Sequence, residues 1–392
     1  MDKRTDFEIE WERIQKDIAE LEGDALRSPI DSQKEVRFVY RLYQRASLSG
    51  KLLDFDVVEV ALRRAIEQWG PLPEFYFLKA NLDLKFHRIA EARCDLEVSP
   101  GLAESVQGKA LRVDLDFQEG RYEEARKGCE SVLRQNRTWD NLVRLAYMKA
   151  TMGDAAGAEE LYIEAEDELT AKEMQQFAWV ELQRGLLHLA HGRYENAWVH
   201  YERSGRAYSG YWLVDEHKAE WLGAQGKFEE AAALYGQVIA RVPRPEFQQA
   251  LGELYVFMGQ PVKARSWLEK ALAGYLESVQ RGEVHYYHHL VDFYADVIKN
   301  GPEAVKWARK DLELRENFST QSALAWALYR AEEYSEALEM INKALASGVK
   351  DSHLLYKAGM IQLSAGRTEE SSRYLHMVSE INPHYQNYHV HR

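Results

Sequence analysis

Cysteine and proline are scarce in this chain of 392 residues, which contains 2 cysteines and 9 prolines. Two thiols cannot form a disulfide framework, so we expect Cys94 and Cys129 to be buried or half-buried free cysteines. Ala, Leu, Glu, Lys and Arg are abundant instead. Because these residues have high helix propensity and few prolines interrupt them, the composition favours helix along the whole chain.

Long apolar segments are also missing. No stretch approaches 18 consecutive apolar residues, the minimum for a membrane-spanning helix. The first residues, MDKRTDFEIEWERIQKDIAELEG, contain no apolar core of a signal peptide, and acidic residues follow directly. We therefore expect a cytoplasmic protein with no membrane partner.

Basic clusters are absent too. Lys and Arg occur in nothing longer than short pairs such as Arg63-Arg64, and the net charge is −13. An acidic chain is repelled by phosphate backbones and by anionic membrane surfaces. We expect no nucleic-acid partner, and a protein or peptide partner that is neutral or basic rather than acidic. The oligomeric state is not indicated.

Short motifs of catalysis and cofactor binding do not occur. The chain contains no GxGxxG, Walker-type loop, GxSxG, HExxH or CxxC pattern. Its many carboxylates single out no catalytic pair. The sequence therefore predicts a protein that is not an enzyme and has no cofactor.

A repeated hexamer is the most conspicuous feature that the chain does have. GRYEEA at 120–125 returns as GRYENA at 192–197. Aligned on its final small residue, the hexamer recurs through most of the chain at intervals of 33, 33, 39, 34, 33, 40, 33 and 34 residues. Regular intervals of this length are typical of repeat architectures. The aligned positions are Ala92, Ala125, Ala158, Ala197, Ala231, Ala264, Ala304, Ala337 and Ser371.

Each repeat has the pattern of two amphipathic helices joined by a tight turn. In 139–170, the apolar residues recur at helical spacing on both sides of Gly153. Glycine permits the positive φ of the turn, the aromatic residue two positions later fills space, and the alanine allows two helices to approach closely. Such a unit cannot bury its apolar face alone, so neighbouring units must stack.

These positions resemble the tetratricopeptide repeat family over about 73–392. The resemblance implies an all-α fold, a right-handed α-solenoid of stacked antiparallel helix pairs with about nine units in 73–392. Asp292 departs from it, because a small residue is expected at that position. The residues that match are the small first-helix residues Ala146, Gly185, Ala219, Gly252, Ala325 and Gly359, the second-helix aromatics Tyr162, Tyr201 and Tyr235, and the terminal prolines Pro243 and Pro383.

Residues 1–72 precede this array and form a separate segment in the prediction. We expect a capping helix at 5–22, a short loop at 23–32 and a degenerate helix pair at 35–50 and 54–70. Terminal units of repeat proteins are often atypical because they must cap the core.

The resemblance also implies a partner-binding groove, lined by the first helix of each unit. Some family members hold a carboxylate with Lys and Asn at two groove positions, and no unit here has that pair. The groove is expected to be aromatic at its ends and acidic in its middle. Its predicted partner-binding residues are Tyr147, Trp179, Glu216, Glu220, Glu253, Tyr286, His289, Phe293 and Trp326.

Three functions remain open at this point. The leading hypothesis is a non-catalytic scaffold or adaptor that holds a peptide segment or a partner protein in the concave groove. The alternative is a peptide-sensing cytoplasmic regulator of the same family. The third is a metal-binding or enzymatic protein built on the array, because His285, His288 and His289 share a helical face and His384, His389 and His391 lie in the last segment.

Overall fold

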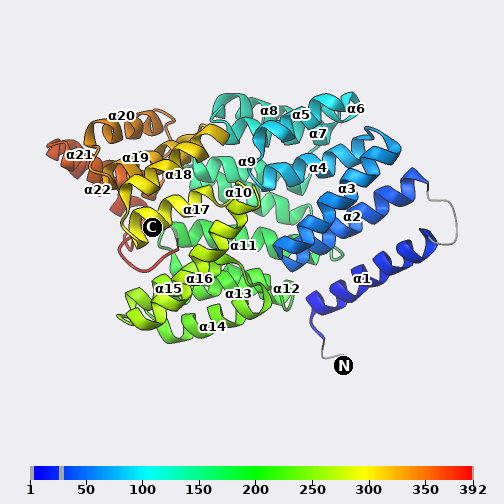
Figure 1. Cartoon of the computed structure of the whole chain (residues 1–392), viewed down its shortest axis with the longest axis horizontal. Coiled ribbons are helices and arrows are strands. Elements are labelled where there is room, and N and C mark those ends of the chain that lie inside the picture. Colours follow the sequence, from blue (N-terminus) through cyan, green and yellow to red (C-terminus); the bar gives the residue numbers. More distant parts are fainter. Residues whose placement is uncertain (1–3, 26–30, 391–392) are drawn as a thin grey trace.

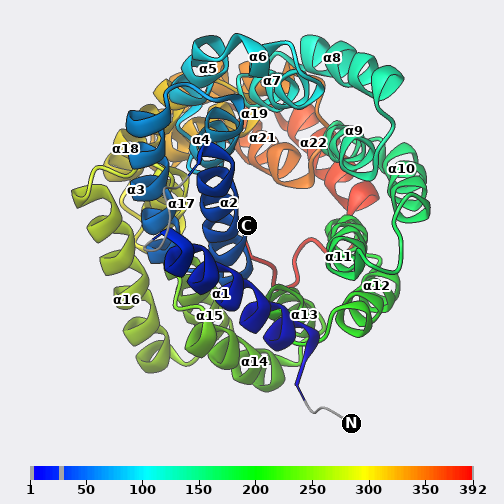
Figure 2. The same cartoon turned by 90° about the vertical axis from the view of Figure 1, so that its right-hand side faces the viewer.

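A computed structural model describes residues 4–25 and 31–390. In these residues all regular secondary structure is helical, and the helices wind around a common axis (Figures 1 and 2). The predicted all-α solenoid of stacked antiparallel helix pairs is confirmed.

Three helices precede the array. They are α1 (Asp6–Ala25), α2 (Ser32–Ser49) and α3 (Leu52–Trp69), close to the expected ranges. The loop expected at 23–32 is shorter, since α1 continues through Gly23, and residues 26–30 lie outside the described part of the chain.

The array follows as antiparallel pairs in which consecutive helices pack against each other. A single turn, α6 (Pro100–Ala103), lies between the first two pairs. The pairs are α4 (Pro73–Lys85) with α5 (Ile89–Val98), α7 (Val106–Gln118) with α8 (Tyr122–Gln135), α9 (Trp139–Thr151) with α10 (Ala155–Asp167), α11 (Met174–Ala190) with α12 (Tyr194–Ala207), α13 (Trp212–Ala224) with α14 (Phe228–Arg241), α15 (Pro245–Phe257) with α16 (Pro261–Gln280), α17 (Tyr287–Asp292) and the π-helix η1 (Phe293–Val297) with α18 (Gly301–Leu314), α19 (Phe318–Arg330) with α20 (Tyr334–Leu345), and α21 (Ser352–Ser364) with α22 (Thr368–Ile381).

Close packing within a pair explains the small residues of the repeat. A Cβ atom added to Gly185 would lie 2.3 Å from Cε1 of Tyr201, a ring that is fully buried. The hexamer alanines Ala125 and Ala197 are also fully buried. A larger side chain at these positions would push the two helices apart, since protein cores are packed without spare volume.

The two longer intervals of the repeat come from longer helices. The interval of 39 residues includes α11, which has 17 residues, and the interval of 40 includes α16, which has 20. In the unit that follows α16, the predicted register at Asp292 does not hold. Val291 and Ala295 are among the buried residues there, and Asp292 lines an inner cavity instead.

The superhelix turns back on itself, so that its later pairs lie beside its earlier ones. In Figure 2, α19, α21 and α22 lie behind the helices from α5 to α9. Asn317 donates its side-chain amide to the Gln118 carbonyl at 2.7 Å, and the Phe318 N–H donates to the Tyr122 hydroxyl at 2.8 Å. At the other end of the coil, the Trp212 indole donates to the Leu48 carbonyl at 2.9 Å.

The two cysteines differ in their surroundings. Cys129 is buried, as expected, but Cys94 is exposed, because its side of α5 has no neighbouring helix over it. None of the described helices has the length and apolar content needed to cross a membrane.

Candidate binding surface

The inner surface of the superhelix contains three adjoining cavities. One, of about 530 Å³, lies among α4, α7, α9 and α11, and a second, of about 580 Å³, shares Tyr147 and Gln183 with it. A third, of about 500 Å³, lies among α15, η1, α19 and α21 and shares Asp292 and Lys357 with the second. The shared residues make the three cavities parts of one inner surface.

Five of the predicted groove residues lie on this surface. Tyr147 is 49% exposed and lines two of the cavities, and Trp179 lines one of them with its ring 6.4 Å from that of Trp139. The other three predicted groove residues on this surface line the third cavity. They are Glu253 on α15, His289 on α17 and Trp326 on α19.

Tyr286 and Phe293 do not belong to the accessible surface. They are 1% and 2% exposed and lie in the core around α16 to α19. The Tyr286 ring lies 4.9 Å from that of Tyr275, and its hydroxyl donates to Glu246 at 2.8 Å. The physical reason is the π-helix η1, which changes the helical register assumed for these two residues.

Glu216 and Glu220 lie on α13 on either side of His217. The His217 Nδ1 atom lies 3.0 Å from Glu216 and 3.8 Å from Glu220. Burial lowers the pKa of His217, but the two carboxylates outweigh it and place the pKa above its ordinary value. Two carboxylates beside a single imidazole leave this part of the inner surface acidic.

A segment of the chain itself lies on the same surface. Residues 382–390 follow α22 and extend across the inner side of α13 and α15, as the red segment near the C label in Figure 2 shows. The Asn387 side chain donates to the Ala224 carbonyl at 3.0 Å, and the Tyr388 hydroxyl donates to the Ala250 carbonyl at 2.9 Å. The Val390 N–H donates to the Glu220 carboxylate at 3.0 Å. No periodic pattern in the sequence predicts this docking.

A slot in α13 receives the ring of Tyr388, which is 3% exposed. A Cβ atom added to Gly223 would lie 2.4 Å from its Cδ1 atom. Glycine at this helical position therefore allows the aromatic ring to approach the helix backbone.

Two segments of the chain, residues 219–276 and 322–372, match the family model described as tetratricopeptide repeat. They fall in α13 to α16 and in α19 to α22, and the same glycine, alanine and aromatic positions recur in the other pairs. The chain therefore contains tetratricopeptide repeats. The fold indicates a protein-interaction scaffold.

Solved structures resemble this chain at low identity. A tetratricopeptide repeat protein from Parabacteroides merdae is 16% identical, with 63% of this chain and 94% of that chain covered and a TM-score of 0.38. The APC/C hetero-tetramer Cut9-Hcn1 is 15% identical, with 88% of this chain and 74% of that chain covered and a TM-score of 0.44. Yeast Tom70 is 13% identical, with 95% of this chain and 90% of that chain covered and a TM-score of 0.41. No curated protein gives a significant match.

The histidines singled out in the sequence pack among aromatic rings, and the rings of His288 and His289 lie 4.1 Å apart. The His285 ring lies 4.9 Å from Phe86, and the His289 ring stacks on Tyr275 at 5.4 Å. In the last segment, His384 stacks on Tyr194 at 5.1 Å, and His391 lies outside the described residues. These histidines pack against aromatic rings of several different helices.

Proposed function

We propose that this protein is a non-catalytic scaffold that holds an extended segment of a partner protein on the inner surface of its superhelix. The partner segment would lie across α13 and α15, where the chain's own residues 384–390 lie. The docked C-terminal segment is the observation that carries the proposal.

The contacts of this segment have the chemistry of peptide recognition. Two backbone carbonyls, those of Ala224 and Ala250, accept side-chain hydrogen bonds from it, and the Glu220 carboxylate accepts a backbone N–H. An N–H that is bonded to a carboxylate makes a stronger hydrogen bond than one between neutral groups. The slot at Gly223 adds a pocket for one aromatic side chain, which supplies contact area for little loss of conformational entropy.

The charges favour a neutral or basic occupant. Glu220 and Glu253 lie along the part of the surface that the segment covers, and the buried Glu216 lies near Tyr388. Residues 382–392, NPHYQNYHVHR, contain no carboxylate side chain. Like charges brought together at an interface cost several kcal/mol, so an acidic segment is disfavoured. Cytoplasmic location is part of the same proposal.

A labelled peptide with the sequence of residues 382–392 tests the proposal. In the wild-type protein the chain's own segment competes for the surface. The double variant Asn387→Ala/Tyr388→Ala removes two of its hydrogen bonds and the buried ring, so the labelled peptide should bind this variant at least about tenfold more tightly than the wild type, a difference of about 1.4 kcal/mol. Fluorescence anisotropy measures the affinity.

Two glycine variants sharpen this test. Gly223→Ala, added to the double variant, closes the slot for the tyrosine ring and should abolish peptide binding. Gly236→Ala on the neighbouring helix α14 meets nothing within 4 Å and should leave binding unchanged. The proposal fails if the peptide does not bind the folded double variant, or if Gly223→Ala has no more effect than Gly236→Ala. A peptide with glutamate in place of its histidines should bind more weakly, and equal binding would overturn the charge preference.

A further inference from the structure

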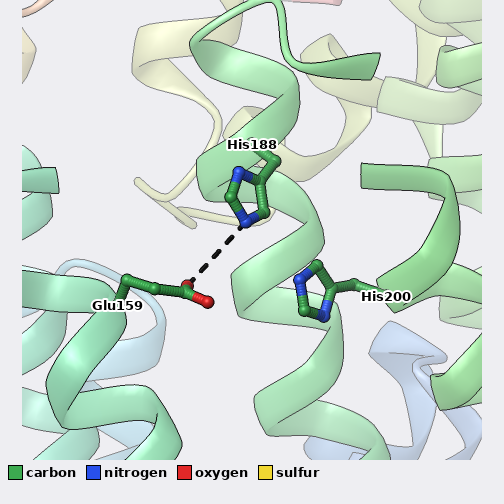
Figure 3. Close-up of side chains that lie close together, drawn as sticks. All are labelled: Glu159, His188 and His200. Atoms are coloured by element: carbon green, nitrogen blue, oxygen red, sulfur yellow. Dashed lines mark ion pairs between the residues drawn. The ribbon is translucent and has the colours of Figure 1, made fainter. Parts of the chain in front are cut away.

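Two histidines and a glutamate meet between three successive helices, away from the docked segment. Glu159 comes from α10, His188 from α11 and His200 from α12. One ligand atom of each residue lies within 4.8 Å of the others, and Nε2 of His188 is 3.9 Å from Oε2 of Glu159. Figure 3 shows both imidazoles with a ring nitrogen turned toward the same space beside the Glu159 carboxylate. These helices belong to the long 39-residue interval of the repeat.

Neighbouring groups hold two of these side chains in position. The Nδ1 atom of His200 lies 2.6 Å from the Glu181 carboxylate, which is itself fully buried and paired with Arg203 at 2.6 Å. A carboxylate at Nδ1 fixes the proton there and leaves the lone pair on Nε2, the arrangement found around histidines that bind metal ions. The Arg184 guanidinium bonds to the other oxygen of Glu159, Oε1.

One atom at the centre of the group lacks a hydrogen-bond partner. Oε2 of Glu159 is buried and accepts no hydrogen bond from any described residue. Buried polar atoms are almost always satisfied, because leaving one without a partner costs about 1–3 kcal/mol. A structural network alone leaves this atom unexplained.

Charged side chains surround the group. They include three carboxylates, those of Glu159, Glu166 and Glu181, and two guanidinium groups, those of Arg184 and Arg203. With neutral histidines these five groups carry one net negative charge, and the guanidinium of Arg193 near His188 balances it.

We propose that Glu159, His188 and His200 bind a divalent transition-metal ion of the zinc class. Two imidazole nitrogens and one carboxylate oxygen are ligands that zinc accepts, and a three-residue set leaves a fourth position for water. In a tetrahedral site of this kind the ligand atoms lie roughly 3.3 Å from one another. The three ligand atoms must therefore approach one another by about 1 Å when the ion binds. The bound ion would join α10, α11 and α12.

Metal titration of the purified full-length protein tests the site. We expect one equivalent of Zn²⁺ by calorimetry, and one equivalent of Co²⁺ with the visible spectrum of a tetrahedral site. Glu159→Gln and His188→Gln should each abolish the stoichiometric binding. Glu181→Gln, which removes the carboxylate at Nδ1 of His200, should weaken it about 10- to 100-fold.

Controls separate this site from the other histidines of the chain. His376 is exposed on α22, and His376→Gln should leave the binding unchanged. The triple variant His384→Gln/His389→Gln/His391→Gln should also keep it, because these residues lie in the last segment. Circular dichroism of the metal-free variants checks that they fold. The proposal is overturned if the wild type binds no stoichiometric Zn²⁺ or Co²⁺, or if folded Glu159→Gln and His188→Gln bind as the wild type does.

Discussion

The imidazole of His285 illustrates how the folded chain sets the chemistry of one residue. It is 7% exposed, and its Nε2 atom has no hydrogen-bond partner among the described residues. Burial lowers the pKa of His285 to about 4, although the Glu283 carboxylate at 3.8 Å opposes the shift. In the unfolded chain a histidine titrates near 6.5. The unfolded state therefore takes up a proton first as the pH falls.

This difference predicts a loss of stability in acid. The contribution of His285 to the free energy of unfolding is fully present above pH 6.5. It decreases as the pH falls from 6.5 to 4, by up to about 1.4 kcal/mol per pH unit. In His285→Phe the free energy of unfolding should fall less steeply over this window, because the ring cannot be protonated. Urea unfolding at a series of pH values measures the slope. His376→Phe, at an exposed position, should keep the wild-type slope, and the explanation is wrong if His285→Phe keeps it too.

At the scale of the helix turns, glycines with the same conformation have two different roles. Gly120, Gly153 and Gly192 each lie close to the next coil of the superhelix, and an added Cβ would meet Glu316, Lys350 or Asn382 at 2.6 to 2.7 Å. Gly226, Gly259 and Gly366 have the same positive φ and nothing within 4 Å. The two best-preserved hexamers begin with Gly120 and Gly192, so both belong to the group that the next coil constrains.

Alanine substitutions separate the two roles. Gly120 and Gly226 both have a φ of 74°. Gly226→Ala should cost about 1–2 kcal/mol, the penalty of a left-handed backbone for a residue with a Cβ. Gly120→Ala should cost a further 1–3 kcal/mol or so, because its Cβ would lie 2.6 Å from the Glu316 carbonyl oxygen. Equal losses in the free energy of unfolding would show that the coil contact does not constrain this turn.

Sequence periodicity predicted the features that every helix pair requires. The turn glycines, the buried alanines and the second-helix tyrosines recur at fixed intervals, since each pair solves the same packing problem. Tyr286 and Phe293 were placed wrongly because a π-helix changes the register, and a one-residue insertion leaves no periodic signal. The docking of residues 382–390 and the Glu159 group depend on contacts between distant or non-repeating positions, which a single sequence does not reveal.

For the whole molecule, contacts between coils change how the array is expected to unfold. An open solenoid is stabilised only by its nearest neighbours along the chain. Here hydrogen bonds join residues far apart in sequence, such as Trp212 with Leu48 and Asn317 with Gln118. Because these bonds couple the early pairs to the late ones, we expect unfolding to be more cooperative than in an open array. Loss of one contact should loosen a pair that is distant in sequence.

Asn317→Asp tests this coupling without removing the helix cap. The side-chain oxygen Oδ1 of Asn317 accepts from the N–H groups of Ser319 and Thr320. A carboxylate can accept these bonds too, but the side-chain donor to the Gln118 carbonyl is lost. The substitution should lower the free energy of unfolding by about 1–3 kcal/mol. Each loss of 1–2 kcal/mol should make the backbone amides from Gln118 to Tyr122 exchange with deuterium about five- to thirty-fold faster. Asn300→Asp, which changes another capping asparagine, should leave those amides unchanged. If the two variants exchange alike there, the coils are not coupled through Asn317.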